Sequence, residues 1–469
     1  MMRSSTPFFS FIPGAFPFRG SLGFRKGLAG WLLAGLILTA VALGGCSPHR
    51  KIYAKLETMA AKGEYEEGLK LIEETKKTYG GNNEVIYHLD RGMYAHLAGK
   101  YAESNQAFEQ AERLMDELYT ESITKHIGAF ATNDSNLPYP GEDFEQVTVN
   151  IYRAINYASL GQMDEALVEA RKVDNKLNVI NQQYSAKDKN AYSEDAFARM
   201  LMATFYQAGG SQDDLNDAFI SNRKAVAIYQ KQYAPLYHVG PPGFLKNNYL
   251  ATAGFMGGEE LQQAKQLFPG NNSYNLSDLR NHGLVVFVHS AGKGPVKEEE
   301  SFRAQMPDGN FFAVAFPRYV RRSSLITGAR VVVDGNPAIA LDPAAPIGDI
   351  AIQNLKNRIG RIRVKAIARA TAKYIANRAI QSAARSDEEK ALAFIVGNVA
   401  TLATESADLR AWETLPDQIL IGGVLLPPGK KHIVVEFTSG KQDVVTTRDL
   451  GDIEITPGKT RFISLHTIQ

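Results

Sequence analysis

The first half of the chain places apolar residues at the spacing of amphipathic helices. Three segments carry apolar side chains at positions i, i+3 and i+4: Glu84–Ala98, Phe144–Leu160 and Glu194–Ala208. Related glycine-led segments stand beside them, at Gly63, Gly99, Gly161 and Gly209. Small and apolar residues follow each glycine, which favours a second helix packed closely against the first. The pattern predicts paired helices from about residue 52 to residue 231.

These glycine-led segments are internal repeats. The interval from Gly63 to Gly99 is 36 residues, and the next two intervals are 62 and 48 residues. The segments resemble the tetratricopeptide repeat, whose period is about 34 residues. Because one helix pair cannot cover its own apolar face, the resemblance implies copies stacked into a solenoid. We therefore expect an all-α, tetratricopeptide-like domain over residues 46–236, with a generic helical bundle as the alternative.

The second half of the chain changes to short apolar runs separated by turns. Residues 237–281 are rich in proline and glycine and are expected to form an irregular linker. Beyond it the expected strands are Leu284–His289, Phe311–Phe316, Arg330–Val333, Ala338–Leu341, Ile419–Leu426, Ile433–Phe437, Val444–Thr447, Ile453–Ile455 and Arg461–His466. Short strands at this spacing favour a β-sandwich-like domain over residues 282–469. The fold class expected for the whole chain is therefore α+β.

A helical insertion interrupts these strands at about residues 348–410. Apolar residues from Ile352 to Ala366 step by three and four, as on one face of a helix. Nine basic residues and no acidic residue lie between Leu355 and Arg385, and four of them form a ridge: Arg358, Arg361, Lys365 and Arg369. This ridge is a candidate contact for an anionic surface such as phospholipid headgroups. The alternative is neutralisation by acidic residues elsewhere in the fold.

The N-terminal segment carries the signature of a secretory signal. Four basic residues precede an apolar run of about 16 residues, Leu28–Leu43, which is short for a membrane span of roughly 20 residues. The run ends in Leu43-Gly44-Gly45-Cys46, which contains the single cysteine of the chain. This ending resembles the lipobox of bacterial lipoproteins, in which the cysteine thiol is acylated after cleavage. The resemblance implies a signal peptide over residues 1–45 and lipidation at Cys46; an uncleaved anchor is the alternative.

Composition narrows the possible partners. The formal net charge is +2, and removal of residues 1–45 with their four basic side chains leaves about −2. A nucleic-acid-binding protein usually shows a clear basic excess, so nucleic acid is not an expected partner. With Cys46 acylated, the mature chain has no thiol for a disulfide or a cysteine metal site. No cofactor is expected.

No sequence motif predicts catalysis. The chain has no nucleophile elbow, and His282 and His289 lack the carboxylate or histidine spacing of a zinc site. Only Trp412, flanked by Asp408 and Glu413, offers an aromatic residue beside carboxylates, as a sugar site would need. This leaves a cell-wall polymer-binding module or hydrolase as the alternative function. A packing tryptophan at the end of a helix is the simpler interpretation.

Several segments together resemble an uncharacterised family of bacterial tetratricopeptide-repeat envelope lipoproteins. The matching segments are Tyr139–Glu145, Asn156–Gly161, Ala166–Lys172, Ala407–Asp417 and Leu426–Gly429. The resemblance implies a lipid-anchored envelope protein without assigned catalysis, which binds unidentified envelope proteins as a scaffold or adaptor. Ser47 after the cysteine resembles the signal for the outer membrane, with the protein facing the periplasm. Cell-wall or outer-membrane assembly is the expected pathway.

Overall fold

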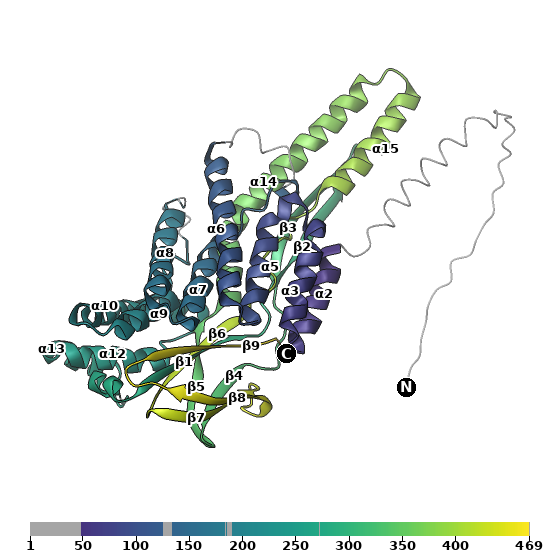
Figure 1. The fold of residues 1–469 in the computed structure, drawn as a ribbon. Coiled ribbons are helices and arrows are strands. Elements are labelled where there is room, and N and C mark those ends of the chain that lie inside the picture. Colours follow the sequence, from purple (N-terminus) through teal and green to yellow (C-terminus); the bar gives the residue numbers. More distant parts are fainter. Residues whose placement is uncertain (1–47, 125–133, 183, 185–189, 272, 469) are drawn as a thin grey trace, which may run out of the picture. The chain divides into compact units, whose positions relative to one another are not determined.

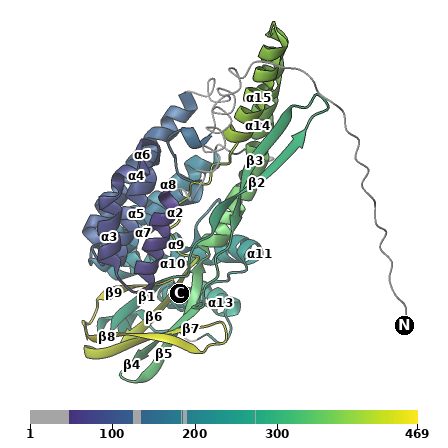
Figure 2. The ribbon, with the colours of Figure 1, turned by 90° about the vertical axis from the view of Figure 1, so that its right-hand side faces the viewer.

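The computed structural model of the chain describes all residues except 1–47, 125–133, 183, 185–189, 272 and 469. Cys46 and the predicted signal peptide therefore lie outside the described residues. Contacts within residues 52–469 group them as one unit (Figures 1 and 2). In the part of the chain that the structure describes, no helix is both long and apolar enough to cross a membrane.

Helices make up the first part of this unit. They are α2 (Pro48–Ala61), α3 (Tyr65–Glu74), α4 (Lys76–Tyr79), α5 (Glu84–Leu97), α6 (Tyr101–Thr124), α7 (Asp143–Ser159), α8 (Met163–Asn181), α9 (Ala196–Gly209), α10 (Gln212–Ile228), α11 (Ala234–Tyr237), α12 (Gly243–Met256) and α13 (Gly258–Leu267). Neighbouring helices pack as pairs, notably α5 with α6, α7 with α8 and α9 with α10. Gly63, Gly99 and Gly161 follow helix ends with φ of +77°, +73° and +78°, which suits a residue without a Cβ atom.

A seven-stranded sheet lies against these helices. Its strands are β1 (Gly283–Ala291), β4 (Gly328–Val333), β5 (Asn336–Ala345), β6 (Gln418–Leu426), β7 (Gly429–Thr438), β8 (Val444–Ile455) and β9 (Thr460–Thr467). Their spatial order is β8-β7-β4-β5-β6-β1-β9. The β1–β9 pair is parallel and the other described pairs in this sheet are antiparallel.

A second group of elements forms an arm, a name used below for β2, β3, α14 and α15. Strands β2 (Val296–Gln305) and β3 (Phe311–Val320) pair with each other in a separate two-stranded sheet. Helices α14 (Ile347–Ala383) and α15 (Asp387–Thr404) pack against β3 and against each other. Figure 2 shows the long α14 running beside this hairpin. The predicted helical insertion at residues 348–410 corresponds to these two helices.

The helices and the sheet share one apolar core. Tyr152 of α7 and Phe197 of α9 belong to the same buried cluster as Val286 of β1 and Ile421 of β6. The opposite face of β1 contributes Phe287 to a second cluster, which the other strands enclose. Because β1 is buried along both faces, its sequence is a continuous apolar run rather than an alternating one.

The expected tetratricopeptide solenoid is wrong. Repeats of a solenoid contact only their neighbours in the array, whereas α7 packs on β9 and α9 packs on β5. The side chains of Tyr152 in α7 and Ser290 in β1 are hydrogen-bonded at 3.0 Å, across the same boundary. The apolar helix faces are thus covered by strands as well as by other helices. An amphipathic pattern shows that one face of a helix is buried. It does not show whether other helices or a sheet cover that face.

The expected β-sandwich is also wrong. A sandwich needs two sheets facing each other, whereas seven of the described strands join one mixed sheet and β2–β3 pack on α14. Residues 237–281, expected as an irregular linker, contain α12 and α13 within the compact unit. Phe244 of α12 lies so close to β6 that a Cβ atom on Gly423 would be 2.3 Å from its ring. Glycine at this position allows the helix to lie directly on the strand.

Candidate functional site

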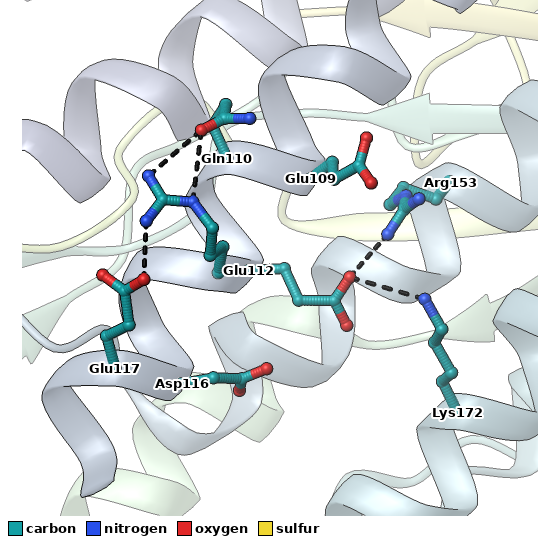
Figure 3. A pocket seen from close by; sticks show the side chains of 8 residues that line it. Glu109, Gln110, Glu112, Asp116, Glu117, Arg153 and Lys172 are labelled. Carbon is teal, nitrogen blue, oxygen red and sulfur yellow. Dashed lines mark hydrogen bonds and ion pairs between the residues drawn. The ribbon is translucent and has the colours of Figure 1, made fainter.

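A hollow lies on helices α6, α7 and α8. It has a volume of about 880 Å³ and is lined by Glu109, Gln110, Glu112, Arg113, Asp116, Glu117, Arg153 and Lys172. Seven of these eight side chains are charged, and both signs are present. Figure 3 shows them in the hollow, which we call the charged groove.

Helix periodicity places most of this lining on one side of α6. Glu109, Glu112, Arg113, Asp116 and Glu117 are spaced by three or four residues, which brings them onto one helix face. Residues on the opposite face are buried against the body of the protein, as Phe108, Ala111 and Met115 are. The side chain of Arg113 donates to Glu117 at 2.6 Å, an i,i+4 pair that holds the exposed edge of the groove.

The floor of the groove is a network of buried ion pairs. The guanidinium of Arg153 in α7 donates to Glu112 at 2.5 Å, and its other terminal nitrogen lies 3.1 Å from Glu169 of α8. Lys172 and Lys176 of α8 lie 3.0 Å from Glu169 and 2.9 Å from Glu112, respectively. Each buried carboxylate therefore meets at least two cations, which offsets the cost of removing these charges from water.

The electrostatics of the floor and the rim differ. Burial alone would raise the pKa of Glu112. The nearby positive charge of Lys176, and the hydrogen bonds that Glu112 accepts from Asn150 and Lys176, outweigh burial and lower the pKa to about 2. Burial raises the pKa of Asp116 at the rim, although Lys176 acts in the opposite direction. Glu112 is consequently a fixed anion at neutral pH. The floor is preorganised, and the carboxylates of the rim, Glu109, Asp116 and Glu117, are more exposed.

A second hollow lies next along the same layer of helices. Its volume is about 360 Å³, and it is lined by residues of α8, α9 and α10 that include Arg171, Asp174, Arg199 and Tyr206. Helix α8 borders both hollows, with Lys172 on the first and Arg171 on the second. The two hollows thus lie on either side of α8, and both have polar linings.

Most side chains of the predicted basic ridge make ion pairs or ring contacts within the chain. Arg358 donates to Glu142 at 2.5 Å, and Arg369 lies 3.2 Å from Glu405 with both side chains buried. The guanidinium of Arg361 stands over the ring of Tyr184, 5.0 Å from its centroid. Lys365 is half-buried and also has an interaction partner. The structure thus spreads the four residues over different partners, and for Arg358 and Arg369 the neutralising acids are intramolecular.

A buried polar junction connects the arm to the helices, and Glu142 is at its centre. This carboxylate precedes α7, where it also caps the helix together with Glu145. Lys297 of β2 and Arg358 of α14 both donate to it. Burial alone would raise the pKa of Glu142, but these two positive charges outweigh it and lower the pKa to about 2.

Glu145 occupies the same junction in a different electrostatic setting. It accepts hydrogen bonds from the hydroxyl of Tyr139 at 2.7 Å and from the backbone N–H of Trp412 at 2.7 Å. Burial, together with the neighbouring charge of Glu142, raises its pKa to about 7. The segment just before α7, which contains Tyr139 and Glu142, therefore forms a packed polar contact rather than an open site.

Trp412 does not form a sugar-binding platform. Its side chain is 2% exposed, and its ring lies 5.5 Å from that of Phe108 and 6.1 Å from that of Tyr152. Asp408 pairs with Arg410 at 2.7 Å. A buried tryptophan cannot stack on a polymer in solvent, so the packing interpretation of Trp412 is the one that fits.

The described residues contain no group of three or more histidine, cysteine, aspartate or glutamate side chains placed to hold a metal ion. His289 is buried in β1 with its Nε2 atom 2.9 Å from the hydroxyl of Thr467. Burial lowers its pKa to about 3, so it is neutral at physiological pH. His282 immediately precedes β1, and its Nδ1 atom lies 3.0 Å from the carbonyl oxygen of Asp278.

Comparison with known proteins adds little to this geometry. No family model matches the sequence, and no curated protein matches it. Among solved structures, the crystal structure of BtubC (BKLC) from P. vanneervenii is similar over 53% of this chain and 89% of that chain. The sequence identity is 13% and the TM-score is 0.32, which is too low to support an argument about function.

Sequence reasoning missed the charged groove. Arg153 lies in a helix predicted for its apolar face, where a lone arginine among residues such as Ile151 and Ile155 could have signalled a buried ion pair. Glu112 and Glu169 gave no such signal, because glutamates are frequent on exposed helix faces. Their pairing depends on α6, α7 and α8 meeting in space.

Proposed function

We propose that this protein is a membrane-tethered binding protein of the bacterial envelope, which acts as a scaffold or adaptor rather than by catalysis. Acylated Cys46 would hold it in the outer membrane facing the periplasm, and the charged groove would bind a polar, charge-bearing segment of a partner protein. The observation that carries the proposal is the groove itself, a large hollow with seven charged lining residues on a fixed ionic floor.

Three features support binding of an extended segment. Glu109 presents an exposed carboxylate at the rim, while Glu112 and Arg153 already satisfy each other on the floor. The second hollow continues the polar surface across α8. Tethering to the membrane would raise the local concentration of the protein near other envelope components, so a modest affinity would suffice.

We expect Cys46→Ala to abolish lipidation. The thiol is the only group in the segment that can form the thioether, so the variant should accumulate as an unprocessed precursor. The measurement is incorporation of a fatty-acid probe, followed by fractionation of the envelope. Ser47→Asp is the matched variant: it should still be labelled, while its membrane address changes. Undiminished labelling of Cys46→Ala would rule out the lipid anchor.

We expect charge reversal at the rim to remove partner binding. A photo-crosslinking residue at Gln110 should give a discrete adduct in intact envelopes, and Glu109→Lys with Asp116→Lys should reduce that adduct at least tenfold. The reason is that two anionic contacts become repulsive, while the pairs that Arg153 makes with Glu112 and Glu169 on the floor keep all their groups. The circular dichroism spectrum and melting temperature should change little, because both substituted side chains are largely exposed.

Asp164→Lys with Glu165→Lys provides the control for this experiment. It introduces the same charge change on α8, at two exposed positions that line neither hollow. Its adduct should match that of the unmodified protein. Equal loss in this control and in the rim variant would show that net charge, not the groove, determines binding. Absence of any adduct at Gln110 would count against the proposed site.

A further inference from the structure

The arm exposes large aliphatic side chains on two helices. On α14, Val364 is 70% exposed and Ile375 is 60% exposed, with Ile367 between them. On α15, Leu392, Ile395 and Val396 are all more than half exposed. Single exposed aliphatic residues are ordinary, but rows of them on adjacent turns mark a surface that another molecule covers.

The two rows face in different directions. The helices meet through Asn377, which donates to Thr401 at 2.8 Å and to the carbonyl of Gly397 at 3.0 Å. At about 3.6 residues per turn, Ile375 is rotated roughly 200° from Asn377, and Leu392 is half a turn away from Thr401. Each row therefore points away from the contact between α14 and α15. One partner cannot cover both rows at once without enclosing the arm.

Small residues accompany the large ones on α14. Ala368, Ala372 and Ala379 are exposed on the same side as Val364 and Ile375. Alternating large and small side chains form ridges and grooves that fit the side chains of another helix. Helix α15 carries such side chains in its exposed row of Leu392, Ile395 and Val396.

Charge also favours a protein partner. The cations of α14 that could meet anionic lipid are mostly engaged within the chain: Arg358 with Glu142, Arg369 and Lys373 with Glu405, and Arg363 over the ring of Phe316. The exposed end of the arm holds Asp387, Glu388 and Glu389 at the start of α15, which anionic headgroups would repel. Basic Arg385 lies in the turn between α14 and α15, at the same end of the arm, whereas Arg378 is paired with Asp308 at 3.3 Å within the chain.

We propose that the arm joins copies of this chain head to tail, with the exposed row of α14 in one copy packed on the exposed row of α15 in the next. Arms standing side by side in the same direction bring Arg385 of one copy next to Asp387 and Glu388 of its neighbour. Because the two rows differ and lie on different sides, the contact is heterologous and repeats from copy to copy. Such a contact closes into a ring when the rotation between copies allows it.

The test uses residues 47–469, which contain the whole compact unit and lack the single native cysteine. Mass photometry of the unmodified chain should show assemblies larger than a dimer. Ile375→Cys combined with Leu392→Cys in one chain, treated with a short bis-maleimide, should give a ladder of dimers, trimers and larger products. Ile375→Cys paired with Val179→Cys, an exposed aliphatic position on α8, should give no ladder.

Two single-site variants separate the remaining possibilities. Ile375→Arg should reduce the assemblies to monomers with an unchanged melting temperature, because this side chain is 60% exposed. Dimers formed efficiently by Ile375→Cys alone would show a two-fold contact instead and overturn the head-to-tail proposal. A monomeric chain at micromolar concentration would overturn it as well. So would a monomer that binds phosphatidylglycerol vesicles and loses that binding in Ile375→Arg, since the row would then be a membrane contact.

Discussion

Lys297→Met is expected to lower the free energy of unfolding by about 3–5 kcal/mol, because it leaves a buried carboxylate short of a cation. The side chains of Lys297 and Glu142 are only 3% and 9% exposed. Lys297 also donates to the carbonyl of Arg410 at 2.8 Å, so its loss leaves that oxygen without this bond. Chemical denaturation followed by circular dichroism at 222 nm measures the change.

The control is an exposed ion pair on the same hairpin. Arg318 of β3 lies 3.1 Å from Glu298 of β2, and these side chains are 58% and 44% exposed. Arg318→Met should cost no more than about 1 kcal/mol, because solvent already screens this pair. If Lys297→Met lowered the free energy of unfolding as little as Arg318→Met, the buried ion pair of Lys297 with Glu142 would not be what stabilises the fold.

The effect of Lys297→Met should also depend on pH. In the unmodified protein the pKa of Glu142 is lowered to about 2, against an ordinary value of about 4.3. A carboxyl with a depressed folded-state pKa stabilises the fold above its ordinary pKa, and this contribution is lost as the pH falls towards about 2. Without Lys297 the pKa of Glu142 rises, so the carboxyl becomes neutral earlier. The difference between variant and unmodified protein should therefore narrow below about pH 4.

Trp412→Ala is expected to cost about 3–5 kcal/mol, the range for deleting a buried aromatic side chain. Trp412 packs against Phe108 of α6 and Tyr152 of α7, and its indole N–H donates to Thr414 at 2.9 Å. These contacts tie the segment before β6 to the helices. Deleting the ring opens a cavity where the two halves of the chain meet, so both halves should lose stability together.

Trp412 also gives a direct readout of this coupling. The sequence has two tryptophans, and the other, Trp31, lies in the predicted signal peptide. In a chain without residues 1–46, fluorescence excited at wavelengths that tyrosine does not absorb therefore reports Trp412 alone, while circular dichroism reports the helices. The two denaturation curves should have the same midpoint. Separate transitions would show that the helices unfold independently of the C-terminal half. Phe255→Ala, at a 43% exposed position on α12, is the control and should change stability by no more than about 1 kcal/mol.

Local pattern alone identified most of the secondary structure. The helical spacing of Phe144–Leu160 corresponds to α7, and the apolar run Leu284–His289 corresponds to β1. The strand β2 was missed, because its sequence, Val296–Gln305, is polar and five consecutive residues in it are exposed. The only buried cation on that strand is Lys297, whose role depends on a carboxylate 155 residues earlier in the chain.

The sequence by itself determined where helices and strands form, because backbone preference and the spacing of apolar residues act over a few neighbouring positions. It also determined the signal-like N-terminal pattern and the basic bias of α14. Only the tertiary structure decided that α7 and α9 lie on a sheet, that Glu112 meets Arg153, and that Arg358 meets Glu142. The physical reason is that the hydrophobic effect has no direction and a charge attracts any opposite charge nearby. Which surfaces and charges become neighbours is therefore settled by the packing of the whole chain.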